Sequence, residues 1–168
     1  TRALIVRAKI YNKIKGYDKA LSDYEKLITI DPKNPELYFW RTDVYEDLEN
    51  YEKAVEDYNI SIGLDSLFGK YYLGRADAYK KLEEFEKALK DYDKAIELEP
   101  NNDVFYSDRA KFYYYQYKDN NKAIEDFEKA IEINSNKSEY FTELGNIYAY
   151  EKRIGEALKS FDKAINLD

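Results

Sequence analysis

The chain has 168 residues, of which 44% are hydrophobic and 36% are charged, and its formal net charge at pH 7 is −7. A chain of this length forms one domain or an array of small units, and it buries about two thirds of the surface that it exposes when unfolded. The lack of His, Cys and Met excludes disulfides, thiol nucleophiles, zinc sites built from Cys or His, and catalytic triads that need an imidazole.

The charge and the residue types also bear on partners and on fold class. Acidic residues outnumber basic ones by 34 to 27, which argues against binding to nucleic acid. No apolar run reaches the roughly 18 residues of a membrane span, so no membrane insertion is expected. The 19 Tyr, with only 3 Pro and 6 Gly, favour helices packed through large side chains over β-sandwiches and barrels, which need many turns.

A short pattern recurs along the chain at a nearly constant spacing. It occupies residues 17–24, 51–58, 85–92, 121–127 and 155–161. Ala20, Ala54 and Ala88 lie 34 residues apart, and Ala123 follows 35 residues after Ala88. Such a fixed period is the signature of a repeat architecture. The sequence therefore contains five copies, at residues 1–34, 35–68, 69–102, 103–137 and 138–168.

Each copy is predicted to form two helices joined by a short link. In the second copy, the residues of one helical face are Tyr38, Arg41, Thr42 and Tyr45 in the first helix and Ala54, Val55, Tyr58, Ser61 and Ile62 in the second. Gly16 is placed at the C-terminal cap of the first helix. Asn34 and Pro35 are a good N-cap and first residue for the next helix. Pro32 and Pro100 follow the ends of second helices, which a Pro cannot continue.

These copies resemble the tetratricopeptide repeat (TPR) family. The third copy has the family's large, small, aromatic and Pro positions as Tyr72, Ala76, Tyr79, Ala88, Tyr92, Ala95 and Pro100. The resemblance covers essentially the whole chain and implies an all-α TPR-type α-solenoid, a right-handed superhelix of antiparallel helix pairs that forms a single array over residues 1–168. The fourth copy has one extra residue near residues 116–121, so its first helix or its link is expected to be irregular.

Comparison of the copies indicates a charged pair within each helix pair. The first four copies share an Arg and an Asp, which are Arg7 and Asp23, Arg41 and Asp57, Arg75 and Asp91, and Arg109 and Asp126. In the fifth copy both charges are lost together, to Leu144 and Ser160. Because a buried guanidinium requires a carboxylate, we expect short Arg–Asp contacts that serve the architecture.

The resemblance also implies where a partner binds. In the TPR family the first helices line a concave groove that holds an extended peptide or a helix, and the equivalent partner-binding residues here are Phe39, Trp40, Asp43, Asp47, Lys70, Asp77, Lys81, Asp108, Lys111, Tyr115, Asn146 and Tyr150. Trp40, the only Trp, is predicted to lie outside the packing positions and to anchor a partner; the alternative is that it packs on the neighbouring repeat. Asp43, Glu46 and Asp47 form an acidic strip beside it. These mixed charges favour a peptide with basic and apolar residues.

The predicted function is a protein–protein interaction scaffold that binds a peptide or helix of an unidentified protein, with no cofactor, metal or catalytic residue. Enzyme activity is not expected, because the sequence has no Gly-rich phosphate loop, metal-ligand spacing or nucleophile motif. Single-stranded RNA binding, as in related pentatricopeptide arrays, is a remote alternative in which Tyr114 and Tyr115 stack on bases. The acidic balance argues against it. No cellular compartment is indicated.

Self-association is the nearer alternative. Solenoids need polar caps at their ends, and the apolar residues near both ends of this chain have no neighbouring repeat in the sequence. They are Ala3, Leu4, Ile5 and Val6 at the start and Leu158, Phe161 and Ile165 at the end. The sequence therefore predicts either packing between chains, which would give a homo-oligomer, or flanking repeats beyond these residues.

Overall fold

A computed structural model describes residues 1–167 and shows helices without any β-strand in that part of the chain. The last residue of the fifth predicted copy, residue 168, lies outside the described residues. The helices form two compact units, Thr1–Leu98 and a second unit from Glu99 onward. That residues 1–168 form a single array stays a prediction.

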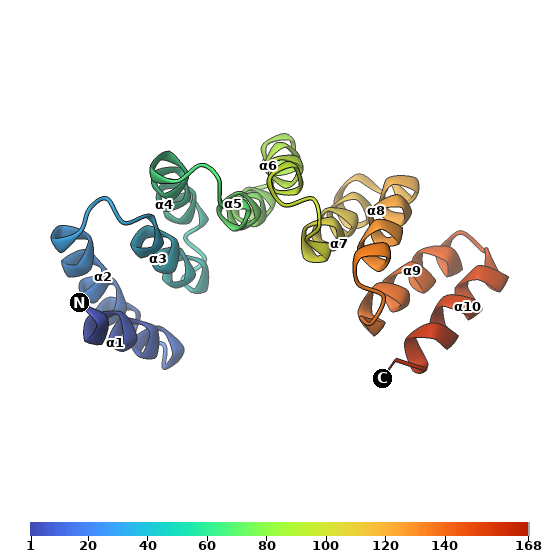
Figure 1. Cartoon of the computed structure of the whole chain (residues 1–168), viewed down its shortest axis with the longest axis horizontal. Helices are drawn as coiled ribbons and strands as arrows, with labels where there is room; N and C mark the ends of the chain where they lie inside the picture. The colour runs from blue at the N-terminus through green and yellow to red at the C-terminus, as the bar shows by residue number, and fades with distance from the viewer. Residues whose placement is uncertain (168) are drawn as a thin grey trace. The chain divides into compact units, whose positions relative to one another are not determined.

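In both units the helices follow one another as antiparallel pairs (Figure 1). The first unit contains α1 (Arg2–Lys13), α2 (Tyr17–Ile30), α3 (Pro35–Asp47), α4 (Tyr51–Leu64), α5 (Gly69–Lys81) and α6 (Phe85–Leu98). The second contains α7 (Asp103–Phe112), the π-helix η1 (Tyr113–Tyr117), α8 (Asn120–Ile133), α9 (Ser138–Tyr150) and α10 (Ile154–Ile165). Within each unit a helix packs on its neighbours in sequence. Each predicted copy is therefore one helix pair.

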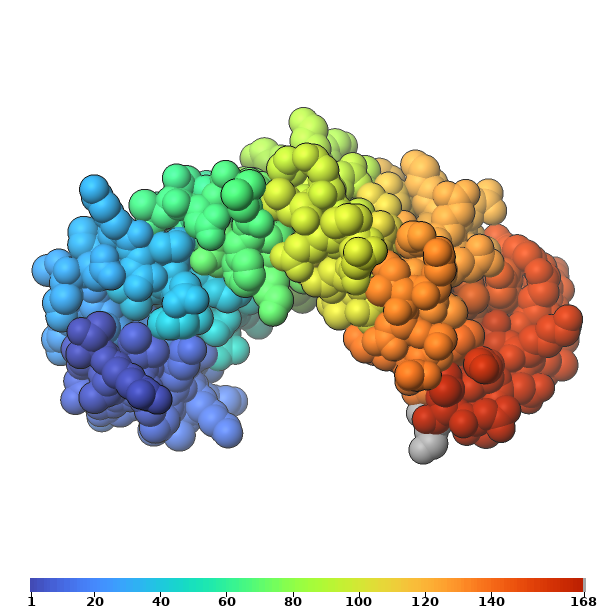
Figure 2. Space-filling view, viewed as in Figure 1, coloured from blue at the N-terminus to red at the C-terminus, as the bar shows by residue number. Residues whose placement is uncertain are grey.

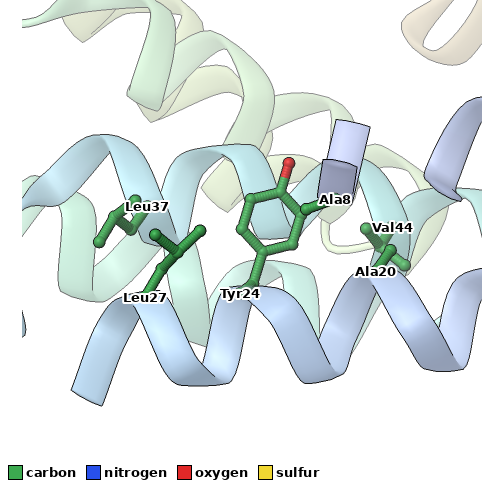
Figure 3. Packing of buried hydrophobic residues seen from close by; sticks show 6 residues of the cluster. All are labelled: Ala8, Ala20, Tyr24, Leu27, Leu37 and Val44. Carbon is green, nitrogen blue, oxygen red and sulfur yellow. The ribbon is translucent and has the colours of Figure 1, made fainter. Parts of the chain in front are cut away.

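The core between the first two pairs shows why small and large residues alternate in the repeat (Figure 3). Ala8 of α1 and Ala20 of α2 are fully buried, so their helices approach closely. The ring of Tyr24, 1% exposed, fills the space beside them, and Leu37 and Val44 of α3 complete the cluster. Interiors are packed as densely as organic crystals, so a larger residue at Ala20 has no room.

The predicted helix start at Asn34 is confirmed. The side-chain oxygen of Asn34 accepts a hydrogen bond from the backbone N–H of Glu36 at 3.1 Å, and Pro35 is the first residue of α3. This bond satisfies one of the four backbone N–H groups that a helix start leaves without an intrahelical partner. Equivalent side-chain caps at other helix starts are made by Asn50, Asn102 and Asp119.

The prediction for Gly16 is wrong. The left-handed residue after α1 is Lys15, with φ of 60°, whereas Gly16 has φ of −83°. The backbone N–H of Gly16 donates to the Tyr11 carbonyl at 2.7 Å and that of Lys15 donates to the Asn12 carbonyl at 2.9 Å, the two bonds of a Schellman cap. The same left-handed conformation recurs at every link, in Lys15, Glu49, Glu83, Lys118 and Lys152. The left-handed residue therefore occupies the same position in every helix pair, and Gly16 lies one residue after it.

The expected irregularity of the fourth copy is confirmed. Its first helix changes from the α to the π form at Tyr113 and continues as η1 to Tyr117, and Lys118 then adopts the left-handed conformation. A π-helical segment has a wider turn than an α-helix and accommodates an inserted residue. The extra residue is thereby absorbed before α8 begins.

The four predicted Arg–Asp pairs are present. In the second copy, Arg41 Nε and Nη2 each donate to a different oxygen of Asp57 at 2.7 Å. The pairs Arg7–Asp23, Arg75–Asp91 and Arg109–Asp126 have the same two-bond geometry, with distances of 2.7 to 2.8 Å. In the fifth copy, the positions are held by buried Leu144 and Ser160. The pairs join the two helices of one copy, as expected for an architectural contact.

Candidate partner-binding surfaces

The twelve predicted binding residues lie on first helices and divide between the units. We call Phe39, Trp40, Asp43, Asp47, Lys70, Asp77 and Lys81, on α3 and α5, together with Glu46, the first-unit surface. We call Asp108, Lys111, Tyr115, Asn146 and Tyr150, on α7, η1 and α9, the second-unit surface.

The first-unit surface is dominated by carboxylates of α3. Glu46 is half-buried and accepts a hydrogen bond from the Tyr58 hydroxyl at 2.8 Å. Burial is the main cause that raises the pKa of Glu46 to about 7, and the charges of Asp43, Asp77 and Asp47 raise it further. Within residues 1–167, Asp43, Glu46 and Asp47 form no ion pair. The surface therefore holds negative charge that none of the described residues neutralises through an ion pair.

Asp77 provides a contrast on the neighbouring helix α5. Its carboxylate accepts a hydrogen bond from the Tyr92 hydroxyl at 2.7 Å, in the same way that Glu46 accepts one from Tyr58. Lys80 also forms an ion pair with Asp77. Asp77, in the next repeat, therefore has the cationic partner that Glu46 lacks.

Gly74 is what allows Tyr58 to reach Glu46. A Cβ atom added to Gly74 would overlap the Tyr58 ring and hydroxyl. Tyr58 is 3% exposed, so its ring has no free space into which it can withdraw. Glycine at this point of α5 therefore follows from the close approach of the tyrosine.

Trp40 takes part in packing, contrary to the expectation that it lies outside the packing positions. It is half-buried against the cluster of Ala8, Tyr24 and Leu37, and the Nζ atom of Lys9 lies 3.8 Å from the centroid of its ring. A lysine over an indole face is attracted by the electron density of the ring. The alternative of packing on the neighbouring repeat is therefore realised, and the other predicted role, as a partner anchor, stays a prediction.

The remaining residues of the first-unit surface differ in exposure. Phe39 is half-buried and packs on Tyr58 and Tyr71, with ring centroids 6.1 and 5.0 Å apart. Lys70 and Lys81 are exposed. Phe39 therefore contributes to the core as well as to the surface, while the two lysines are free to contact a partner.

The second-unit surface brings aromatic and charged residues of α7, η1 and α9 together. Lys111 forms an ion pair with Glu139 at 2.6 Å, and the Tyr115 hydroxyl donates to Glu143 at 3.4 Å. The ring of Tyr150 lies edge-on to that of Tyr114, 6.5 Å between centroids. The remaining predicted residues are the half-buried Asp108 and the exposed Asn146. Lys111 and Tyr115 of this set thus contact α9 directly.

Sequence reasoning placed Glu46 in the acidic strip but did not select it among the binding residues. Its negative charge is visible in the sequence, whereas its burial depends on how α4 and α5 pack against α3. The one signal that could have identified it was the small residue Gly74 opposite Tyr58.

Apolar residues near both ends of the described chain are open to solvent. Val6 is 51% exposed, Leu158 58% and Ile165 71%, whereas Phe161 is half-buried. The last helix pair is drawn in red in the space-filling view (Figure 2). Leu4 and Ile5 are half-buried against the core cluster of the first unit, so the prediction of uncovered residues is wrong for these two and for Phe161. The homo-oligomer itself stays a prediction.

Among the described residues, no group of three or more acidic side chains is arranged to hold a metal ion. No helix in that part of the chain is long and apolar enough to cross a membrane.

Comparison with protein families identifies the repeat. Models described as tetratricopeptide repeat match residues 69–102 and residues 35–66, 109–137 and 138–168, and one described as TPR repeat matches residues 8–49. No curated protein matches the chain.

Several solved structures have a similar fold. A crystal structure of MamA is 24% identical, with a TM-score of 0.83 over 95% of this chain and 93% of that chain. PilF of Pseudomonas aeruginosa is 19% identical, with a TM-score of 0.85 over 99% of this chain and 76% of that chain. YrrB, described as a TPR protein with an unusual peptide-binding site, is 22% identical, with a TM-score of 0.73 over 98% and 84% of the two chains. At these identities the likeness shows the fold, an all-α TPR solenoid.

Proposed function

Because the chain belongs to the tetratricopeptide repeat family, whose fold supports protein–protein interaction, we propose that its first-unit surface binds a cationic segment of another protein. The segment is extended or helical and carries Lys or Arg next to apolar residues. The single observation that carries the proposal is the set of three α3 carboxylates, Asp43, Glu46 and Asp47, without an ion-pair partner among the described residues.

The electrostatics of Glu46 support this partner chemistry. Burial and like charges disfavour its ionised form and raise its pKa to about 7. A cation brought into contact reverses that effect, since an opposite charge within a few ångströms stabilises the carboxylate. Binding of a basic side chain therefore lowers the pKa of Glu46. It is also expected to release a proton near neutral pH.

Trp40 and Lys9 indicate how an arriving cation is accommodated. Lys9 already occupies one face of the indole. Burial raises the pKa of Asp43, and the charge of Lys9 partly opposes that rise. A partner's cation competes with Lys9 for the same ring and the same carboxylates. Lys9→Met should therefore strengthen binding of a cationic peptide about threefold, measured as Kd, because it removes the competitor and keeps the aliphatic stem. Weaker binding by this variant would contradict that arrangement.

The direct test uses fluorescein-labelled peptides in which Lys and Arg alternate with Leu and Phe, with fluorescence anisotropy as the measurement. Asp43→Asn/Glu46→Gln/Asp47→Asn should weaken binding at pH 8 by about tenfold or more. The matched control is Glu52→Gln/Glu56→Gln/Glu86→Gln, which changes the net charge equally at exposed carboxylates of α4 and α6. Equal losses in both variants would show a non-specific charge effect and refute the proposed surface.

The proton release has its own measurement. Isothermal titration calorimetry in buffers of different ionisation enthalpy should show release of a fraction of a proton at pH 7, and Glu46→Gln should abolish it. A proton release that is unchanged in Glu46→Gln would place the titrating group elsewhere.

A further inference from the structure

The fifth copy lacks a stacking arrangement that the other four share. In each of these, the ring of a Tyr in the first helix lies close to both an Arg of the same helix and a Lys of the second helix. For Tyr45 the distances from the ring centroid are 5.6 Å to Arg41 Cζ and 5.6 Å to Lys53 Nζ. The equivalent distances in the other three copies, around Tyr11, Tyr79 and Tyr113, are 5.1 to 5.9 Å.

In the fifth copy the tyrosine is kept and its charged neighbours are changed. Tyr148 has Leu144 in place of the Arg and Glu156 in place of the Lys. Arg153 stacks on Tyr148 instead, 4.4 Å from the ring centroid, and its Nε donates to Glu156 at 2.7 Å. The charge of Glu156 is therefore neutralised by its neighbour, and Ser160 replaces the Asp that would have paired with an Arg.

These exchanges leave an apolar pocket between α9 and α10. It has a volume of about 370 Å³ and is lined by Phe141, Leu144 and Tyr148 of α9 and by Glu156, Lys159, Ser160 and Lys163 of α10. Lys159 and Lys163 border it on α10, and neither forms an ion pair within the described residues. We call this the fifth-copy pocket. None of its lining residues belongs to the two partner-binding surfaces.

The corresponding place in the first copy has a different chemistry. A pocket of about 360 Å³ is present there, and its lining includes Arg7 and Asp23, which pair with each other, together with Lys19 and Lys26. A pocket at this place is therefore not unique to the fifth copy. The two pockets differ in that the fifth-copy pocket lacks the Arg–Asp pair, because Leu144 and Ser160 replace it.

We propose that the fifth-copy pocket binds an apolar side chain, Leu or Phe, of a partner segment whose flanking residues are acidic. Insertion of the side chain removes its apolar surface, and that of the pocket, from water, and this burial is the main favourable contribution to the free energy of binding. Lys159 and Lys163 attract carboxylates on either side of the inserted residue. A partner's Arg does not fit, because Ser160 replaces the Asp that would pair with it and Glu156 is already paired with Arg153. The other two charged residues of the lining, Lys159 and Lys163, are cationic.

The variant that fills the pocket copies the Arg–Asp pair of the other four copies. Leu144→Arg/Ser160→Asp introduces the pair that the other four copies hold at the same place, so the fold is expected to be kept. The probe is a fluorescein-labelled peptide with one Phe between two pairs of Glu, and the measurement is fluorescence anisotropy. The double variant should bind at least tenfold more weakly than the unaltered chain, with an unchanged circular dichroism spectrum.

The bordering lysines give a second variant that does not depend on repacking. Lys159→Glu/Lys163→Glu changes two exposed side chains and should also weaken binding at least tenfold. Its control is Lys90→Glu/Lys94→Glu, the equivalent lysines of α6 in the third copy, which should leave binding within twofold.

Three results would overturn the proposal. They are no saturable binding of the Phe peptide by the unaltered chain, equal binding of a peptide with Ser in place of Phe, and equal losses in both lysine variants. The Asp43→Asn/Glu46→Gln/Asp47→Asn variant should bind this acidic peptide no more weakly than the unaltered chain does. That outcome keeps the fifth-copy pocket separate from the first-unit surface.

Discussion

The helix pair α3–α4 and the helix pair α9–α10 have the same fold but differ in what holds them together. In α3–α4, Arg41 and Asp57 are joined by two hydrogen bonds, and their side chains are only 15% and 3% exposed. In α9–α10 the same places hold Leu144 and Ser160, 6% and 8% exposed. The two helices pack on each other in both pairs.

The difference indicates that the ion pair is not required for the fold, provided that both of its members are replaced. Burying two charges removes them from water, and their mutual attraction offsets that loss only when the geometry is good. Removing one member leaves the other buried without compensation. The first four copies therefore keep both charges and the fifth keeps neither. A single substitution leaves one charge buried without its partner.

The largest effect is expected for Asp57→Ala. It leaves the guanidinium of Arg41, 15% exposed, without a carboxylate, so the free energy of unfolding should fall by about 3–5 kcal/mol. Urea denaturation followed by circular dichroism measures this loss. A fall below about 1 kcal/mol would place the pair among surface ion pairs and remove the basis of the comparison.

Asp23→Ala is the matched substitution in the first copy. Arg7 is 53% exposed, against 15% for Arg41, so water can hydrate its guanidinium once the carboxylate is gone. The loss of stability should therefore be clearly smaller than for Asp57→Ala. Equal losses would show that the exposure of the arginine does not set the outcome.

A buried charge without a cation gives the next largest effect, in the same helix pair. The folded chain raises the pKa of Glu46 to about 7, above its usual value of 4.5, so the folded state binds a proton more tightly than the unfolded state. The free energy of unfolding should therefore fall as pH rises from about 4.5 through about 7 and then level off.

Glu46→Gln removes this dependence and still accepts the hydrogen bond of Tyr58. It should stabilise the chain by about 2 kcal/mol at pH 8 and change it little at pH 4. Urea denaturation at a series of pH values is the measurement. A variant that is less stable than the unaltered chain at pH 8 would mean that ionised Glu46 is favoured by its surroundings.

Features that depend on spacing within one copy were predictable from the sequence. The period predicted the helices, and the joint loss of charge at Leu144 and Ser160 predicted the Arg–Asp pairs of the other four copies. The extra residue of the fourth copy predicted the irregularity that the structure shows at η1. In each case the copies could be compared with one another, because residues at the same position of different copies have the same local surroundings.

Features that depend on how one copy packs on the next were not predictable in this way. The contact of Lys9 with Trp40 joins α1 to α3, and the burial of Glu46 requires Tyr58 of α4 to lie against Gly74 of α5. Neither follows from the period, and only the second has a signal in residue type, the small residue Gly74. The cap at Lys15 was missed for a different reason, since five left-handed residues other than glycine accept a strain that sequence preferences disfavour.

The smallest effect is expected when the second copy is given the residues of the fifth. Arg41→Leu/Asp57→Ser removes both charges together, so neither is left buried alone, and the free energy of unfolding should change by only about 1 kcal/mol. The two single substitutions should together lower stability by several times that amount, which makes a double-mutant cycle the right measurement. Tyr38 and Tyr45, which flank Arg41 with ring centroids 5.8 and 5.6 Å from its Cζ atom, supply the aromatic walls for Leu. A double variant as unstable as Asp57→Ala would show that the fifth copy depends on residues other than Leu144 and Ser160. Arg153 and Glu156 would then be the first further residues to transfer to the second copy.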